Sequence, residues 1–212
     1  MRDADFFRRW MTAAGASVER EADRLTELDS PIGDADHGSN LLRGFRAVRA
    51  ALEADPAATP GTVLQLAGRT LISTVGGASG PLYGTLLRRT GKDLGEAGEI
   101  SDDELRKALY AGVGAVAQLG GAAPGDKTML DALVAGVTAL STSYRAAADA
   151  AENGARATVP MLARKGRASY LGARSIGHQD PGATSAALLL TALADVADAA
   201  DSADAADSAD AG

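Results

Sequence analysis

Apolar residues recur every three or four positions along most of this 212-residue chain, and this spacing constrains its fold more than any other feature. Apolar residues with this spacing line one face of an α-helix. Three stripes are the clearest: Phe7, Trp10, Ala14, Val18 and Leu25; Leu105, Leu109, Val113 and Val116; and Leu130, Leu133, Val137, Leu140 and Tyr144. Further helices are expected over residues 39–54, 61–75, 80–90, 155–165 and 183–197. The pattern predicts about eight helices joined by loops rich in glycine and aspartate.

The residue types agree with an all-α fold. Only 4% of residues are aromatic while Ala and Gly are abundant, which favours closely packed helices over a β-sandwich. The segment "TLISTV" at 70–75 is the one stretch whose β-branched content suits a strand, and Pro160 is expected to kink its helix. We predict one domain over residues 1–197.

The last fifteen residues, 198–212, form an acidic low-complexity tail with the repeat DAADSA. They hold five aspartates and no Lys or Arg, so of the net charge of −7 only about −2 belongs to the rest of the chain. A tail without large apolar residues is expected to be disordered. A nearly neutral body argues against nucleic acid as a partner, because nucleic-acid binding needs a basic face.

The composition also indicates the cellular compartment of the protein. The chain has no cysteine, so disulfides and thiolate metal sites are excluded and a reducing compartment is favoured. The N-terminal residues lack the apolar core of a signal peptide, and we see no apolar run of the roughly 18 residues that would span a bilayer. We therefore expect a cytoplasmic protein with no membrane partner.

The stretch "LDSPIGDADHGSN" at 28–40 crowds Asp29, Asp34 and Asp36 just before His37. Carboxylates this close repel one another unless a cation or a set of donors lies between them. Aspartates with one histidine favour Mg²⁺ or Mn²⁺ over zinc. The next residues begin a helix whose backbone N–H groups could receive a phosphate. The alternative is that the aspartates are ordinary turn and N-cap residues.

Two other motifs are near matches to known sites. "GGAAPGDKT" at 120–128 carries an extra residue, Asp126, between Gly125 and Lys127, and so is not a phosphate-binding P-loop. The aspartate stretch lacks the spacing and the final glutamate of an EF-hand. Neither motif therefore assigns a function.

Four segments together resemble the nucleotide-binding (L) subunit of bacterial dihydroxyacetone kinase of the phosphoenolpyruvate- and phosphocarrier-dependent type. They are "DSPIGDADHGSN", "VGGASGPLYGT", "PGDKTMLDAL" and "ARKGRASYLGARSIGHQDPGATS", and they follow the family's order up to about residue 195. The resemblance implies a barrel of eight antiparallel helices with a nucleotide site in the loops at one end. It also implies that a phosphocarrier M subunit phosphorylates bound ADP, and that the phosphoryl group then passes to dihydroxyacetone on a K subunit.

The resemblance assigns the metal ligands to Asp29, Asp34 and Asp36. It implies a nucleotide held with two Mg²⁺ ions, and a charge count agrees: one ion would leave about −4 on ADP and the aspartates, too much for Arg167 and Lys127 to balance. The nucleotide contacts that it implies are His37, Gly38, Ser39, Asn40, Ala78, Ser79, Gly120, Met129, Arg167, Asp180, Pro181 and Gly182.

For three positions a structural role stays open beside the functional one. Ser79 could be a helix N-cap, Met129 a core residue, and His178 a loop-ordering residue. Two other functions stay open as well: an ATP-dependent kinase of a related ketose or other small substrate, and a non-catalytic helical module that senses nucleotide.

Overall fold

The structure, a computed structural model, describes residues 1–55 and 57–210 and is almost entirely helical. The expected all-α class is confirmed, with one short exception: β1 (Arg2–Asp3) pairs antiparallel with β2 (Glu99–Ile100). The helices are α1 (Ala4–Asp29), α2 (His37–Ala54), α3 (Pro60–Thr74), α4 (Ser79–Leu94), α5 (Asp102–Gly120), α6 (Met129–Ala139), α7 (Tyr144–Ala157), the 3₁₀ helix η1 (Arg167–Ser175) and α8 (Pro181–Asp210).

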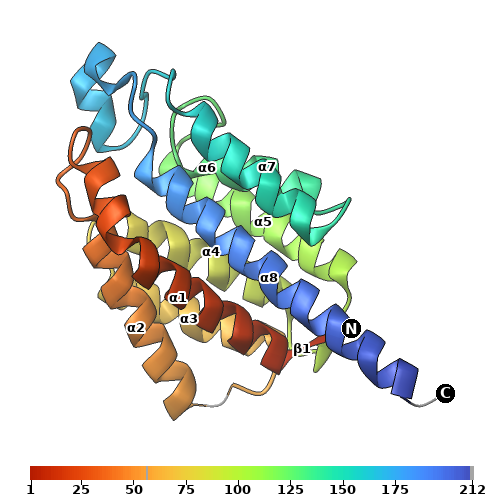
Figure 1. Cartoon of the computed structure of the whole chain (residues 1–212). Helices are drawn as coiled ribbons and strands as arrows, with labels where there is room; N and C mark the ends of the chain where they lie inside the picture. Colours follow the sequence, from red (N-terminus) through yellow and green to blue (C-terminus); the bar gives the residue numbers. More distant parts are fainter. Residues whose placement is uncertain (56, 211–212) are drawn as a thin grey trace.

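Each helix packs against the next along the chain, and α8 returns to pack on α1 (Figure 1). Close approach between α3 and α4 depends on glycine: a Cβ on Gly68 would lie 2.7 Å from the backbone oxygen of Gly84. Additional contacts of α1 with α3 and of α6 with α8 fill the interior. The helices thus form a bundle, and the expected closed eight-helix barrel is not confirmed.

The stripe at the N-terminus forms the centre of the core. Phe7 and Trp10 of α1 are fully buried, and the indole Nε1 of Trp10 donates a hydrogen bond of 2.9 Å to the backbone oxygen of Leu189 in α8. The helix begins where Asp3 caps it, by accepting a hydrogen bond from the backbone N–H of Phe6. The hydrogen bond from Trp10 to Leu189 joins the first and last helices of the bundle.

Two expectations about local structure are wrong, and the alternative of a strand at 70–75 is decided in favour of the helix. The segment 70–75 lies largely in α3 and is no strand, because its apolar side chains follow the helical spacing of that helix. The third stripe is divided, since α6 ends at Ala139 and Ser143 caps a new helix, α7. The helix expected over 155–165 does not form: α7 ends at Ala157, and Pro160 lies in an irregular segment.

Helix α8 continues to Asp210, within the segment for which composition predicts disorder. Arg145 of α7 pairs with Asp195 and Asp198, and Arg2 pairs with Asp201 at 2.7 Å, so cations from other elements hold this part of the helix. Residues 211–212 lie outside the described part. By length and composition residues 181–203 could cross a membrane, yet 61% of the most apolar window is buried inside the protein, as in a core helix.

Candidate functional site

A cleft of about 310 Å³ lies at the end of the bundle opposite the two termini, where the α1–α2 loop and η1 meet (Figure 1). Four chain segments far apart in sequence contribute to its walls: the aspartate loop, the glycine-rich α3–α4 loop, the α5–α6 loop, and the segment from 165 to the start of α8. The site is thus built from loops on a rigid helical frame.

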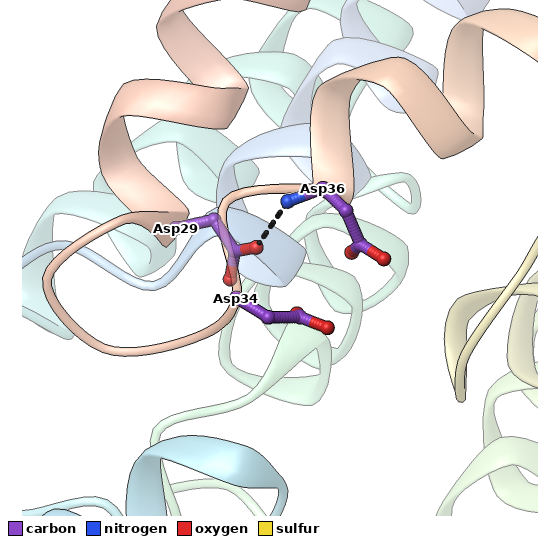
Figure 2. A group of neighbouring side chains, drawn as sticks. All are labelled: Asp29, Asp34 and Asp36. Carbon is purple, nitrogen blue, oxygen red and sulfur yellow. Dashed lines mark hydrogen bonds between the residues drawn. The ribbon is translucent and has the colours of Figure 1, made fainter.

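Asp29 anchors the aspartate loop and is itself buried. It is the last residue of α1, and its Oδ2 accepts hydrogen bonds from the backbone N–H groups of Asp36 at 3.0 Å and His37 at 3.3 Å. The loop folds tightly over this carboxylate, because a Cβ on Gly33 would lie 1.9 Å from its Oδ1. Figure 2 shows the three aspartates and the first of these bonds.

Asp34 and Asp36 project from the loop to the same side (Figure 2). Between them Ala35 adopts a left-handed conformation with φ of 59°, which is unusual for a residue other than glycine. Asp36 occupies the N-cap position of α2, yet its side chain makes no capping hydrogen bond. The N-cap alternative therefore fails for its carboxylate, which stays available to a ligand.

One carboxylate oxygen from each aspartate lies within 4.8 Å of the other two. Oxygen ligands this close suit a hard divalent cation such as Mg²⁺, which keeps several waters and takes one or two carboxylates from the protein. The cleft itself continues beyond them, so the donor set fits a metal shared between the protein and a second ligand.

His37, the first residue of α2, lies in a buried row of hydrogen-bonding side chains. Its Nδ1 is 3.3 Å from the hydroxyl of Ser79, and its Nε2 is 2.8 Å from the hydroxyl of Ser185, which lies 2.7 Å from that of Tyr83. Burial lowers the pKa of His37 despite the nearby charges of Asp29 and Asp36. The ring is therefore held neutral.

Ser79 does not cap its helix, since the N-cap of α4 is Ala78. The α3–α4 loop before it passes close to Asn40: a Cβ on Gly76 would lie 3.2 Å from its Oδ1. The same Oδ1 accepts a hydrogen bond of 2.6 Å from Arg43. The amide group of Asn40 is therefore oriented with its oxygen toward Arg43, which leaves its N–H donors for other partners.

The lining of the cleft also includes apolar side chains, among them Met129, Leu82 and Val116. Met129 is only 5% exposed and belongs to the main core, yet it also lines the cleft. Its position therefore agrees both with a core residue and with a nucleotide contact. A lining that combines apolar side chains with carboxylates and backbone amides is the composition that a nucleotide, with its base and its phosphates, requires.

Lys127 serves the structure of the site. Its side chain is buried, and its ammonium donates to the backbone oxygens of Thr158 at 2.9 Å, Ser175 at 2.7 Å and Met161 at 3.2 Å, with a further contact to His178. These acceptors use all three of its protons. These bonds hold the segment 158–178 in place. Lys127 also lines the cleft, and its charge can still offset that of a ligand.

Asp180 lies just before α8 and accepts a hydrogen bond of 2.7 Å from the backbone N–H of Ala183. Burial raises its pKa to about 7, and the nearby carboxylates of Asp131 and Asp29 act in the same direction, while Lys127 opposes them. A carboxyl group that titrates near neutrality in a cleft is a common property of ligand sites.

The structure brings most of the expected residues together. Those that line the cleft are Asp29, Asp34, Asp36, His37, Asn40, Ala78, Ser79, Gly120, Met129, Arg167, Asp180, Pro181 and Gly182. Gly38 and Ser39 do not line it. Gly38 packs against α1, where a Cβ would lie 1.9 Å from the oxygen of Ala22, and the Ser39 hydroxyl donates to the backbone oxygen of Asp36.

The sequence interpretation missed several residues of the site, and the polar ones of most interest are Tyr83, Ser185 and Lys165. Tyr83 and Lys165 line the cleft, and Ser185 contacts His37. Tyr83 and Ser185 each stand a few residues after a glycine of a site segment, in "GPLYG" and "PGATS". The sequence did hold a signal for these two residues, because each is a polar residue on the buried face of a helix near its first turn.

Comparison with known proteins gives consistent matches. A family model described as the DAK2 domain matches residues 31–195. The chain is 45% identical over 195 residues to the "PEP-dependent dihydroxyacetone kinase, ADP-binding subunit DhaL" of Escherichia coli (strain K12), across 87% of this chain and 93% of that protein. It is 42% identical over 204 residues to the "PEP-dependent dihydroxyacetone kinase 2, ADP-binding subunit DhaL" of Listeria innocua, across 91% and 94%.

A solved structure is also similar. The crystal structure of the dihydroxyacetone kinase from C. freundii in complex with AMP-PNP and Mg²⁺ matches with a TM-score of 0.71 and 28% identity. The match covers 91% of this chain and 33% of that kinase, so this chain spans about a third of its length.

Proposed function

The chain belongs to the DAK2 domain family, and we propose that it is the ADP-binding subunit of a dihydroxyacetone kinase, one that takes its phosphoryl group from a phosphocarrier M subunit. The observation that carries the proposal is the group of three carboxylates within 4.8 Å of one another, in a cleft that is also lined by apolar side chains. In this proposal the nucleotide remains bound as a carrier of the phosphoryl group, and dihydroxyacetone lies on a K subunit.

The residues present fit Mg²⁺ and a nucleoside diphosphate. Asp29, Asp34 and Asp36 would hold metal, the backbone at Gly77 and Ala78 and the guanidinium of Arg167 would contact phosphate, and Met129 would contact the base. Bound Mg²⁺ supplies compensation for the charge on the phosphoryl oxygens during transfer. Two ions are proposed from the charge count, because a single Mg²⁺ would leave about −4 on ADP and the three aspartates.

The chain's own contribution to transfer is positioning. Phosphoryl transfer needs the acceptor hydroxyl in line with the transferred group, and a subunit that holds the donor alone should be nearly inactive until its partner docks. His37 stays neutral and hydrogen-bonded, and so serves to orient Ser79 at the phosphate side of the cleft.

The decisive assay mixes this chain and the K subunit with catalytic amounts of ADP. Phosphoenolpyruvate with the phosphocarrier proteins is expected to sustain many turnovers, while excess ATP supports few. Rapid turnover on ATP with free exchange of ADP would favour the alternative of an ordinary ATP-dependent ketose kinase. Absence of turnover in every mixture, with ADP still bound, would favour the nucleotide-sensing alternative.

Two finer points belong to the same proposal. We infer a barrel-like closure of the helices, supported by the packing of each helix on the next and of α8 on α1. We also propose that the protein lies in the cytoplasm, supported by the absence of cysteine from the sequence and by the burial of the one strongly apolar helix among the described residues.

A further inference from the structure

A continuous row of hydrogen bonds runs from the core to the cleft. It begins at the hydroxyl of Tyr83, passes through Ser185 and the two ring nitrogens of His37, and ends at Ser79, with distances of 2.7, 2.8 and 3.3 Å. Tyr83, His37 and Ser79 all line the cleft, but the side chains of Tyr83, His37 and Ser185 are buried while Ser79 is partly exposed. Helices α4, α2 and α8 each contribute to this row.

The number of protons in the row exceeds the number of links. Three hydroxyl groups and a neutral imidazole carry four hydrogen-bonding protons. The three links between neighbouring side chains use one proton each. One proton is therefore left over, and it must be donated outside the row.

The spare proton has an inner and an outer destination. At the inner end the backbone oxygen of Gly182 lies 3.1 Å from the hydroxyl of Ser185 and 3.4 Å from that of Tyr83. At the outer end Ser79 borders the cleft. The choice fixes the direction of every link, and with it which nitrogen of His37 carries hydrogen.

With the proton at the inner end, Ser185 donates to Gly182 and accepts from both Tyr83 and His37 Nε2–H. This arrangement uses the full capacity of a hydroxyl group, one donor and two acceptors. The backbone oxygen of Pro181 also lies near the imidazole of His37. Ser79 then donates to Nδ1 and offers only lone pairs to the cleft. This is the arrangement that the protein should adopt without a ligand.

We propose that Ser185 is a positioning residue, which lets His37 change from its Nε2–H to its Nδ1–H tautomer when an anion occupies the cleft, so that Ser79 can donate to that anion. In the second arrangement Ser185 donates to the bare Nε2, and His37 Nδ1–H donates to Ser79. Ser79 then has its own proton free. The row gains and loses no proton, so its net charge is the same in both arrangements.

This inference rests on the proposed function for the identity of the anion, which is the phosphate part of ADP. The gain is one hydrogen bond from a neutral hydroxyl to a charged oxygen, a class that is stronger than bonds between neutral groups. Asp29 and Asp36 are the charged groups nearest His37, and both keep their positions in either arrangement. Ser185 is required because a bare Nε2 without a donor would be a buried, unsatisfied acceptor.

The tautomer can be observed directly. The chain has two histidines, so ¹⁵N labelling of histidine gives two imidazole signals, and His178→Gln assigns them. We expect His37 as the Nε2–H tautomer in the free chain and as the Nδ1–H tautomer with ADP and Mg²⁺ bound. An Nδ1–H tautomer in the free chain, or the same tautomer with and without bound ADP, would overturn the inference.

Two substitutions test the row itself. Ser185→Ala should keep His37 as Nε2–H even with ADP bound, and should weaken ADP binding by about tenfold, measured by calorimetry. Ser202→Ala is the matched control, an exposed serine of the same helix that donates to a backbone oxygen one turn earlier, and should change neither quantity. Should Ser185→Ala not fold, Ser79→Ala removes the outer end instead and should abolish the change of tautomer.

Failure of the inference and failure of the proposed function give different results. ADP that binds tightly without a change of tautomer contradicts the inference alone. A chain that binds no ADP contradicts the proposed function. Inorganic pyrophosphate with Mg²⁺ then replaces ADP as the anion, and a change of the His37 tautomer supports the inference while an unchanged tautomer overturns it.

Discussion

The guanidinium Nη2 of Arg167 lies 3.1 Å from Oδ2 of Asp34, so a cation from η1 contacts the aspartate loop. The two segments are also joined by a small apolar cluster of Ile32, Ala163 and Ala168, with Leu171 packed against it. An ion pair this exposed contributes at most about 1 kcal/mol. Its importance is that Arg167 and a metal ion would compete for the same carboxylate.

Arg167→Gln should therefore change two affinities in opposite directions. Without nucleotide, Mn²⁺ should bind up to about fivefold more tightly, because the competing cation is gone. ADP with Mg²⁺ should bind more weakly, because a donor to phosphate is lost. Mn²⁺ titration followed by magnetic resonance, and calorimetry with ADP, measure the two. A parallel loss of both affinities would mean that Arg167 only maintains the shape of the loop.

Substitution of the aspartates should separate ligand binding from folding. Asp36→Asn should abolish ADP binding in Mg²⁺ yet leave the melting temperature nearly unchanged, because this side chain makes no capping bond. Asp34→Asn should behave in the same way. Asp29→Asn should also weaken the loop, since Oδ2 of Asp29 accepts two backbone N–H bonds. Normal ADP binding by Asp36→Asn, or binding in EDTA, would contradict the metal assignment.

The helices and the aspartate site could be predicted from sequence because both are local signals. The apolar stripe through Phe7 and Trp10 predicted helix α1. Asp29, Asp34 and Asp36 lie within eight residues of sequence, so they had to lie close together in space as well. The role of Lys127 could not be predicted in this way. Its four acceptors lie 31 to 51 residues away, and nothing in "PGDKT" distinguishes a lysine for phosphate from one for backbone oxygens.

The tail at residues 198–212 is a further case. Its repeat contains nothing large to bury, so composition alone predicts disorder. The ion pairs at its start come from Arg2 and Arg145, which lie nearly 200 and about 50 residues away. Long-range ion pairs of this kind leave no periodic signal in the tail itself.

Lys127→Met should destabilise the protein strongly. The substitution leaves several buried backbone oxygens between Thr158 and His178 without a donor, and each costs about 1–3 kcal/mol. The free energy of unfolding should fall by about 3 kcal/mol or more, as measured by urea denaturation. Lys92→Met, on the surface of α4, is the control. If Lys127→Met were as stable as the control, the ammonium would have no structural role.

Removal of residues 198–212 should lower the melting temperature by several degrees, in contrast to the expectation for a disordered tail. The deletion takes away Asp198 and Asp201, the partners of Arg145 and of the buried Arg2. Arg2 would keep Asp102 and its stacking on Phe6. Asp201→Asn should reproduce part of the loss in melting temperature. In an Arg2→Met background the deletion should cost less than in the native chain, because the partner of Asp201 is already absent. An unchanged melting temperature for the deletion would show that these pairs contribute nothing.

Asp180→Asn should stabilise the free protein at neutral and higher pH. The pKa of Asp180 is raised to about 7 by burial, above its unfolded value of about 4, so the folded state binds this proton more tightly than the unfolded state. Stability from this group is therefore fully present below about pH 4 and is lost as the pH rises through 7. Asparagine remains uncharged and can still accept the hydrogen bond from Ala183. We expect the variant to gain about 1–3 kcal/mol at pH 8 and almost nothing at pH 4, measured by urea denaturation without Mg²⁺ or nucleotide. A gain that does not depend on pH would point to packing, and a loss at pH 8 would mean that the charge of Asp180 is needed beside Lys127.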